Sequence, residues 1–399
     1  MKNILILGGG FAGIEAAIFL KKQKFNVTLV SDRDYFYIYP TSIWIPTGES
    51  EFKDICIDLH ELQAAHGFSV RVDPVSSISA KKNEVTLESG IVLKDYDYLI
   101  VAMGAHKMKH KGIGNTLSIC GAPEQSLEIK DKIDELIEQG SGKIAFGFGG
   151  NPKDTSAVRG GPGFELMFNL HNQLKKLGIR DKFELTFFAP MPEPGKRMGP
   201  QALKMMDSFF KRLDIKKHFG KKISHFNKKS IVFEDESKLE SDFIMFIPAG
   251  DGHSVVKKSD LPTNDAGFIK TNDFSQVVFE KDSKPDESMP NNIYAIGDIA
   301  SLEGYDWRAK QGHVAEVMAR NVAHNITQRE LGKTDFKGYH EHLNILCVMD
   351  SGNGAAFVYR DEKRAFMLPM PYIGHWLKKG WGLYCRYSKL GKFPRLPGM

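Results

Sequence analysis

The sequence predicts an α/β fold with two Rossmann-like dinucleotide-binding domains and a C-terminal amphipathic segment that contacts a membrane. Three observations predict the two domains. The chain opens with an apolar strand, Lys2–Leu7, that runs into a glycine-rich turn. A second unit of strand, glycine-rich loop and helix begins at Lys143. Far downstream, Asn291–Ala300 contains a strand that ends in Gly-Asp, and an extended dinucleotide needs support from distant segments of this kind.

The first strand and the helix after it carry a dinucleotide fingerprint. Gly8, Gly10 and Gly13 follow the strand in G-x-G-x-x-G order and open the apolar helix Phe11–Leu20. Gly8 permits a tight turn, Gly10 lets the backbone approach a pyrophosphate, and Gly13 lets the helix pack on the strand. The helix N-terminus then faces the phosphates.

The next strand supplies the acidic end of the fingerprint. Val27–Val30 leads into Ser31 and Asp32, about twenty positions after the glycines, where a carboxylate binds a ribose. A lone fingerprint is weak evidence, but here a matching Gly297-Asp298 pair follows the distant strand. Together these segments predict FAD as the cofactor, with Asp298 bonded to its ribityl chain.

Short strands complete the first domain. Three are expected to form a meander: Phe68–Val72, Glu84–Leu87 and Ile91–Leu93. Tyr98–Val101 is expected to be a buried strand, and Gly104 follows it where the chain leaves this domain.

The second domain begins with a strand at Lys143–Gly147, after a charged, solvated helix at Glu124–Gln139. A helix at Phe164–Leu177 and a strand at Phe183–Phe188 follow. The loop between strand and helix has no compact G-x-G-x-x-G turn, and the strand at Phe183–Phe188 leads to Ala-Pro without an acidic residue. This domain is therefore not expected to bind a nicotinamide cofactor. Strands are also expected at Ile231–Phe233 and Phe243–Ile247, and Val255–Glu287 is polar and loop-rich.

A helix at Ala309–Leu331 follows the Gly-Asp pair. Its positive N-terminal end can point at the flavin ring and stabilise negative charge there. Lys310 and Gln311, at the start of this helix, are expected beside the pyrimidine edge of the flavin and the quinone.

The tail from Met370 is rich in Lys, Arg and aromatic residues and contains no acidic residue. At helical spacing Trp376, Leu383 and Tyr387 share one face, and Lys378 and Lys389 lie opposite. Such a stretch suits a bilayer interface, with rings at the headgroup level and cations on anionic lipid. The alternative is packing on its own domain or on a second subunit. Glycines within the stretch, which each cost about 1 kcal/mol in a helix, leave one helix or two short ones open.

These patterns divide the chain into three parts. Residues 1–105 and 285–340 are predicted to form the FAD-binding domain, and residues 106–284 the second Rossmann-like domain. Residues 341–399 are predicted to form a hairpin and an amphipathic segment that meets the membrane and a quinone.

Composition excludes several classes of protein. A net charge of +5 over 399 residues is too small to argue for nucleic acid, and no apolar run is long enough to span a bilayer. No signal peptide precedes the first strand, so the expected location is cytoplasmic, peripheral on the inner membrane. The four cysteines show no C-x-x-C spacing and no metal site is predicted, with His340 and His342 expected at the surface.

Several motifs together resemble the sulfide:quinone oxidoreductase family, with flavocytochrome c sulfide dehydrogenase and type II NADH dehydrogenase as more distant relatives. The likeness covers nearly the whole chain. It is carried by GGGFAG, VSDRDYFYIYP, DYLIVAMGA, SIC at Cys120, NIYAIGD, KQGHVAE, CVMDSGNGAAF and HWLKKGWGLYCRYSKLGKFPRLPG.

The resemblance implies that FAD takes electrons from sulfide through two redox cysteines and passes them to quinone. Cys347 matches one of these cysteines. Cys120 matches a third family cysteine near the flavin, and Glu165 matches a glutamate that handles protons. The second redox cysteine normally lies in the glycine-rich loop, but Gly147–Glu165 contains no cysteine. Cys120 as a resolving thiol, a low-molecular-weight persulfide as sulfur source, and a different substrate with Cys347 as a packing residue are the alternatives.

The resulting hypothesis is an FAD-dependent oxidoreductase that passes electrons from sulfide, or a related reduced sulfur compound, to a membrane quinone. The alternatives are a type II NADH:quinone oxidoreductase, a flavoprotein sulfide dehydrogenase that donates to a cytochrome, and a non-enzymatic redox sensor. Because relatives assemble into dimers or trimers, a homo-oligomer is expected.

Overall fold

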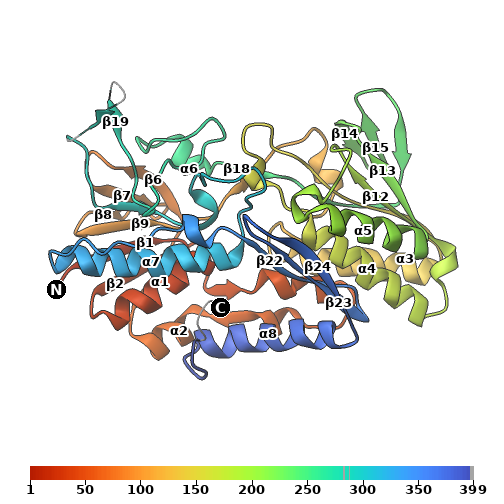
Figure 1. The fold of residues 1–399 in the computed structure, drawn as a ribbon, viewed down its shortest axis with the longest axis horizontal. Coiled ribbons are helices and arrows are strands. Elements are labelled where there is room, and N and C mark those ends of the chain that lie inside the picture. The colour runs from red at the N-terminus through yellow and green to blue at the C-terminus, as the bar shows by residue number, and fades with distance from the viewer. Residues whose placement is uncertain (282–283, 287, 396–399) are drawn as a thin grey trace.

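Two parallel sheets organise the molecule and lie toward opposite ends of its long axis (Figure 1). The computed structural model describes residues 1–281, 284–286 and 288–395. Residues 282, 283, 287 and 396–399 lie outside the described residues. The last four belong to the predicted membrane segment.

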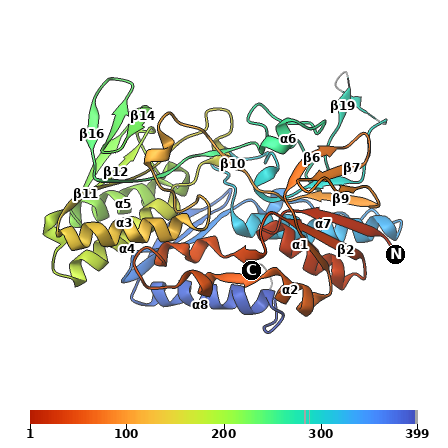
Figure 2. The same cartoon turned by 180° about the vertical axis from the view of Figure 1, so that it is seen from behind.

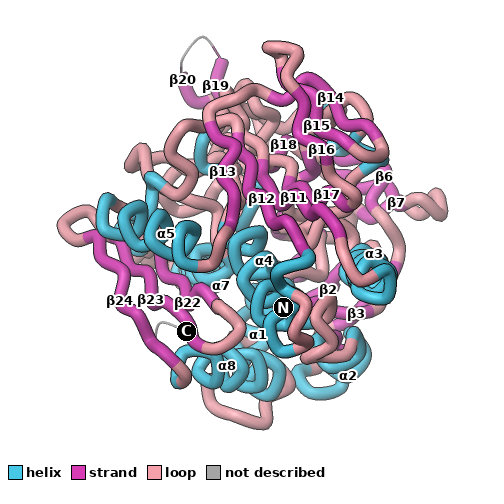
Figure 3. The backbone as a smooth tube through the Cα atoms, turned by 90° about the vertical axis from the view of Figure 1, so that its right-hand side faces the viewer, coloured by secondary structure: helices cyan, strands magenta, loops and turns pink. Residues whose placement is uncertain are grey.

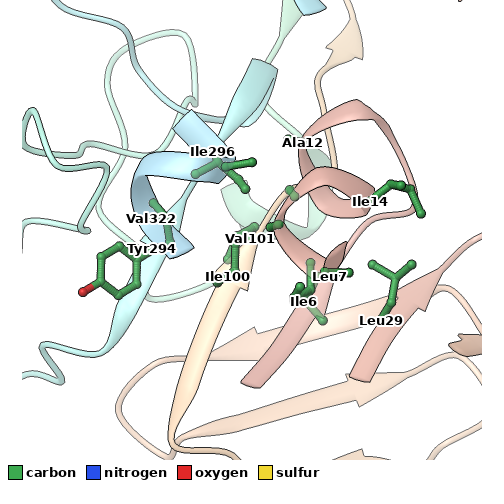
Figure 4. Packing of buried hydrophobic residues seen from close by; sticks show 14 of the residues in the cluster. Ile6, Leu7, Ala12, Ile14, Leu29, Ile100, Val101, Tyr294, Ile296 and Val322 are labelled. Atoms are coloured by element: carbon green, nitrogen blue, oxygen red, sulfur yellow. The ribbon is translucent and has the colours of Figure 1, made fainter. Parts of the chain in front are cut away.

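The first sheet has the order β21-β9-β1-β2-β5, with every neighbouring pair parallel. Its strands are β1 (Asn3–Leu7), β2 (Asn26–Ser31), β5 (Ser69–Val72), β9 (Tyr98–Val101) and β21 (Ile293–Ala295). The helices α1 (Phe11–Lys22) and α7 (Gly312–Glu330) pack against it. Figure 4 shows part of this core, in which Ile6 and Ile100 of the sheet and Val322 of α7 belong to one buried cluster. Apolar runs of this kind are typical of parallel strands buried on both faces.

One expectation about this sheet was wrong. The strand predicted at Phe68–Val72 is not part of a meander, because β5 pairs in parallel with β2 at the edge of the main sheet. The meander is formed instead by β6 (Val75–Ser79), β7 (Glu84–Leu87) and β8 (Val92–Leu93).

The second sheet has the order β13-β12-β11-β17, also parallel (Figure 3). Its strands are β11 (Gly142–Phe148), β12 (Phe183–Ala189), β13 (Ile215–Phe219) and β17 (Phe243–Ile247). Its helices are α3 (Gln125–Gln139), α4 (Gly161–Lys176) and α5 (Pro200–Arg212). The charged helix predicted at Glu124–Gln139 is not fully solvated, because α3 buries Ile129 and Ile133.

Smaller elements lie between the strands and helices of these two units. They are β3 (Tyr35–Tyr37), β4 (Cys56–Asp58), α2 (Leu59–His66), β10 (His106–Lys107), β14 (Ile223–Asn227), β15 (Ser230–Phe233), β16 (Lys238–Glu240), β18 (Gly250–Asp251), α6 (Ser254–Lys257), β19 (Glu280–Lys281) and β20 (Lys284–Pro285). Short 3-10 turns include η1 (Tyr39–Trp44) and η6 (Lys196–Met198).

The C-terminal part is an antiparallel sheet followed by one helix. The strands β22 (Ile345–Asp350), β23 (Gly354–Arg360) and β24 (Ala365–Pro371) lead into α8 (Ile373–Lys389), which runs along the edge of the molecule beside α2 (Figure 2). The helix is continuous through Gly380 and Gly382, so the stretch forms one helix and not two. A Cβ at Gly382 would lie 2.8 Å from Cγ2 of Thr41 in η1, so this glycine lets α8 approach its neighbour.

Candidate functional site

The fingerprint glycines have the local geometry that a dinucleotide requires. Gly8 has φ +114°, and a Cβ there would lie 2.4 Å from the Ala102 carbonyl oxygen. A Cβ at Gly13 would lie 1.8 Å from the Gly8 carbonyl oxygen, so α1 can start this close to β1 only at a glycine. Gly10 has open space around its Cβ position. The N-terminus of α1 therefore has open space where a pyrophosphate would approach. This space fits the pyrophosphate of FAD.

The Gly-Asp pair from the far end of the chain meets this turn. Gly297 has φ +73°, and a Cβ there would lie 3.1 Å from Cβ of Ala12 in α1. The N-terminus of α7 is close by, because a Cβ at Gly312 would lie 3.8 Å from the Phe11 ring. Two helix N-termini therefore converge beside one turn, and their positive ends favour the phosphates and a reduced flavin.

The residues predicted for the adenosine end lie on the other side of the fingerprint. Ser31 is buried, and a Cβ at Gly9 would lie 2.5 Å from its Oγ. The Asp32 side chain is 66% exposed and lies 3.5 Å from Nε of Arg33, so its carboxylate is accessible to a ribose. Gly104 follows β9 with φ +70° and open space around it.

Lys310 and Gln311 lie where α7 begins, as the sequence suggests. Lys310 is buried, its Nζ bonds to the Ala300 carbonyl, and the ammonium lies 4.0 Å from the centre of the Phe268 ring. Burial lowers the pKa of Lys310 to about 8, although Asp154 and Asp298 oppose the shift. The Gln311 Oε1 is buried and has no hydrogen-bond partner within the described protein, which leaves it available to a bound group.

Asp298 has a partner that the sequence analysis missed. Its carboxylate forms an ion pair with Arg159, which comes from the glycine-rich loop of the second domain. Arg159 lies in the glycine-rich loop that lacks the expected cysteine. The missing cysteine was the only feature of the sequence that drew attention to this loop. The pair links the second domain to the turn that is predicted to hold the ribityl chain.

A thiol, a carboxylate and an ammonium group from three elements gather at the C-terminal sheet. Glu165 of α4 is buried, and its Oε1 accepts hydrogen bonds from the Asp350 backbone amide (2.7 Å) and from Nζ of Lys378. Burial raises the pKa of the Glu165 carboxyl, and Lys378 opposes the shift. Burial also raises the pKa of the Cys347 thiol to about 12, with an added contribution from Glu165. The free thiol is therefore protonated at neutral pH.

Cys120 lies near a different set of charges. It is buried, and burial raises the pKa of its thiol, while Lys107 and Arg159 oppose the shift. The charge of Glu165 contributes to the raised pKa of both the Cys120 and the Cys347 thiol. All four cysteines are free. Cys56 is half-buried and Cys385 is buried.

A polar chain that the sequence analysis missed holds α8 beside Glu165. Asp350 is fully buried, and its Oδ2 lies 2.8 Å from Nδ1 of His375. The other ring nitrogen of His375 lies 3.4 Å from Glu49, which also pairs with Lys379. Burial raises the pKa of the Asp350 carboxyl, but the hydrogen bonds from His375 and the Gly352 amide and the charge of Lys378 together outweigh it and hold this pKa below its usual value.

The far end of α8 is anchored by a second buried ion network. Lys389 is fully buried, with Nζ 3.0 Å from Glu15 of α1 and 2.6 Å from Glu316 of α7. Arg320 and Arg395 also bind Glu15. Burial raises the pKa of Glu15, but these cations outweigh it and lower the value to about 2.

The opposite face of α8 is exposed and apolar. Trp376, Leu377 and Leu383 are 71%, 52% and 59% exposed. The idea that Lys378 and Lys389 bind anionic lipid was wrong, because both are buried in ion pairs within the protein. Among the described residues, no helix is both long and apolar enough to cross a membrane. The ranges covered by the structure contain no cluster of metal-ligand side chains, and His340 and His342 are exposed as expected.

Comparisons with known proteins agree with this geometry. A family model described as pyridine nucleotide-disulphide oxidoreductase matches residues 2–321. The chain is 28% identical over 383 residues to the sulfide-quinone reductase of Aquifex aeolicus (strain VF5), covering 90% of this chain and 84% of that protein. It is 21% identical over 396 residues to a type II NADH:quinone oxidoreductase of Staphylococcus epidermidis (strain ATCC 12228 / FDA PCI 1200), covering 92% and 93%.

Solved structures give the same picture. The sulfide:quinone oxidoreductase from Aquifex aeolicus has a TM-score of 0.85 at 26% identity, covering 98% of this chain and 92% of that one. NDH2 from Plasmodium falciparum in complex with NADH has a TM-score of 0.75 at 14% identity, covering 100% and 99%, and shows likeness of fold alone.

These findings confirm the resemblance that the sequence motifs indicate, the α/β fold with its dinucleotide-binding domains, and FAD as the cofactor. They also confirm an FAD-dependent oxidoreductase as the class of enzyme. The membrane contact stays a prediction. The chain therefore belongs to the pyridine nucleotide-disulphide oxidoreductase family.

Proposed function

We propose that this flavoprotein passes electrons from sulfide, or a related reduced sulfur compound, to a quinone. The observation that carries the proposal is the grouping of Cys347, Glu165 and Lys378, in a chain that resembles a sulfide-quinone reductase over most of its length. When bound, FAD supplies a two-electron acceptor that a quinone can reoxidise.

Cys347, Glu165 and Lys378 have different roles in proton transfer. The Cys347 thiol is protonated at neutral pH, so it needs a base before it can act as a nucleophile. The charge of Glu165 acts on this thiol, and a raised pKa makes the Glu165 carboxylate a better proton acceptor. Lys378 binds Glu165 and compensates its charge in a buried setting. Lys310 and the N-terminus of α7 would stabilise negative charge on the reduced cofactor.

The first test is anaerobic reduction of the flavin. Sulfide should bleach the flavin absorbance of the holoenzyme, and NADH should not, because the second domain has no compact phosphate-binding turn. A Cys347→Ser variant should be bleached by sulfide at least a hundredfold more slowly, while a Cys56→Ser control behaves as the parent. Stopped-flow absorbance measures both rates.

Each result of that experiment decides between functions. Rapid bleaching by NADH and none by sulfide would replace the proposal with the type II NADH:quinone oxidoreductase activity of the other relatives. Normal bleaching of Cys347→Ser by sulfide would remove this thiol from the reaction.

We further propose that α8 rests on a membrane surface and admits the quinone from there, so that the protein is peripheral on the inner membrane. The exposed side chains of Trp376, Leu377 and Leu383 support this, since an aromatic and aliphatic face on an amphipathic helix suits the headgroup boundary. Attraction between cations and anionic lipid contributes little, because most of the basic side chains of α8 contact the protein. The apolar face is therefore expected to supply most of the binding free energy.

A double variant, Trp376→Ser with Leu377→Ser, should bind vesicles at least tenfold more weakly. Each apolar side chain that leaves the bilayer costs about 2 kcal/mol of binding free energy. Sedimentation with phosphatidylcholine vesicles measures the effect, and vesicles with added anionic lipid should bind the parent only slightly better. Leu331→Ser, at a site that is 61% exposed after α7, is the matched control. Equal sedimentation of the parent and the double variant would contradict this role for α8.

A further inference from the structure

Two acidic side chains share a buried site where α4 and the end of β22 meet α8. Glu165 is 4% exposed and Asp350 is fully buried. The backbone amide of Asp350 donates a hydrogen bond to Glu165 Oε1 (2.7 Å). The side-chain amide of Asn169 joins the two residues again, because it lies 2.8 Å from the Glu165 backbone carbonyl and 2.9 Å from Asp350 Oδ1. Acidic groups that share a buried site differ in proton affinity when their partners differ.

Asp350 is surrounded by groups that favour its ionised form. Its Oδ1 accepts hydrogen bonds from the Asn169 side chain and from the Gly352 amide (2.7 Å), and its Oδ2 lies 2.8 Å from Nδ1 of His375. Although burial raises the pKa of this carboxyl, these contacts and the charge of Lys378 hold it below its usual value. Asp350 is therefore a fixed negative charge at neutral pH.

Glu165 has the opposite balance. Its pKa is raised by burial, and the charge of Asp350 adds to the shift, while Lys378 and the Asp350 amide oppose it. The charge of Glu165 acts in turn on the Cys347 thiol. The pKa values of the two carboxyls are therefore moved apart. Such a separation is typical of a pair in which one group exchanges a proton and the other does not.

His375 lies between two carboxylates and is only 8% exposed. Its Nδ1 faces Asp350, and its Nε2 lies 3.4 Å from Glu49. A carboxylate only accepts hydrogen bonds, so both contacts are favourable when both ring nitrogens carry protons and the ring is cationic. Glu49 also pairs with Lys379 of α8 (3.2 Å) and with Lys176 of α4 (3.7 Å). Asp350 and Glu49 thus both favour a positive charge on His375.

The site holds a separate cation for each of its two buried carboxylates. Lys378 binds Glu165, and His375 binds Asp350. If His375 were lost, both carboxylates would depend on the one lysine, and a buried carboxylate without its own partner takes up a proton.

We propose that His375 holds Asp350 ionised and thereby makes Glu165 the one carboxyl of the pair that takes up and releases a proton. The proposal rests on the proposed function, in which Glu165 is the base for Cys347. Asp350 and His375 are positioning residues, because they act through Glu165 and not on the reacting atoms.

Infrared titration of the oxidised holoenzyme tests this division of roles. The carbonyl band of a protonated carboxyl reports proton uptake, and its loss in Glu165→Gln assigns it to Glu165. Asp350→Asn removes the fixed negative charge, so the band should appear about one pH unit lower than in the parent. His375→Gln leaves Asp350 without its cation, so a protonated carboxyl should appear about one pH unit higher. His342→Gln, at an exposed histidine, is the matched control and should titrate as the parent.

A double variant shows whether His375 acts through Asp350. In the Asp350→Asn protein, His375→Gln should have less than about a third of its effect in the parent. His375→Lys keeps a cation beside Asp350 and should return the titration toward that of the parent, which separates loss of charge from misfolding. The acid limb of flavin bleaching by sulfide, followed against pH by stopped flow, should move in the same directions as the infrared band.

The outcomes separate this proposal from the one on which it rests. If sulfide fails to bleach the flavin at any pH, the proposed function fails, and the infrared titration still decides whether Asp350 and His375 control Glu165. If sulfide bleaches the flavin but the band titrates alike in the parent, Asp350→Asn and His375→Gln, the pair has no such role. An effect of His375→Gln that is equally large with and without Asp350 would also contradict the proposal.

Discussion

A Gly13→Ala variant is expected to yield almost no FAD-loaded protein. Its methyl group would lie 1.8 Å from the Gly8 carbonyl oxygen, a contact that backbone atoms can relieve only by moving α1 away from β1. That movement would disrupt the turn that receives the pyrophosphate. We expect bound FAD per chain to fall below about a tenth of the parent value, and the thermal midpoint to fall with it, since overpacking typically costs about 1–3 kcal/mol. Absorbance of the purified protein and a thermal scan measure the two effects.

Gly10→Ala is the matched comparison for this prediction. No protein atom lies within 4 Å of its Cβ position, and its φ of −89° is accessible to alanine. This variant should keep the thermal midpoint of the apoprotein while it loses FAD, because the methyl group occupies space left for the pyrophosphate. A Gly10→Ala protein that retains its full complement of FAD would contradict our placement of the phosphates.

A Lys389→Met variant is expected to lose about 3–5 kcal/mol of folding free energy, the usual cost of removing one partner from a buried ion network. Lys389 is fully buried between Glu15 and Glu316, so its loss leaves excess negative charge among α1, α7 and α8. The thermal midpoint should fall clearly, and Lys392→Met, at an exposed position in the same tail, should leave it unchanged.

A double variant separates charge from packing in that network. Adding Glu316→Met to Lys389→Met removes a carboxylate that has lost its nearer partner and keeps only Arg395 at 3.6 Å, while Glu15 keeps its contacts with Arg320 and Arg395. The double variant should recover a large part of the lost stability. If it is no more stable than Lys389→Met alone, the charge of Lys389 is not what the fold requires.

The glycine turn could be predicted from sequence because its chemistry is local. The roles assigned to Gly8, Gly10 and Gly13 depend on neighbours within one βαβ unit, and each has the expected surroundings. The Gly-Asp turn was predictable for a different reason, since two distant motifs belonged to one pattern. Gly297 does lie against Ala12 of α1.

The burial of the basic tail residues could not be predicted in the same way. Whether a lysine on an amphipathic helix meets water, lipid or protein depends on what covers it. The partners of Lys389 lie at positions 15 and 316, and the partner of Lys378 lies at position 165. The same limit explains β5, whose sequence is that of a short strand but whose parallel pairing with β2 is a property of the whole sheet. The start of α5 did carry a signal, because Pro200 occupies the first helical turn.

The anchoring of α8 by Lys378 and Lys389 has a consequence for how this protein is made. The ribosome synthesises both dinucleotide domains before it reaches this helix, so Glu165 and Glu15 wait without their lysines during translation. The nascent domains can collapse and pair their strands, and Glu15 can already contact Arg320, but Glu165 and Glu15 acquire their lysine partners only when α8 docks. Docking of α8 is therefore a late step in the folding of the enzyme, completed by the helix that also carries the apolar face.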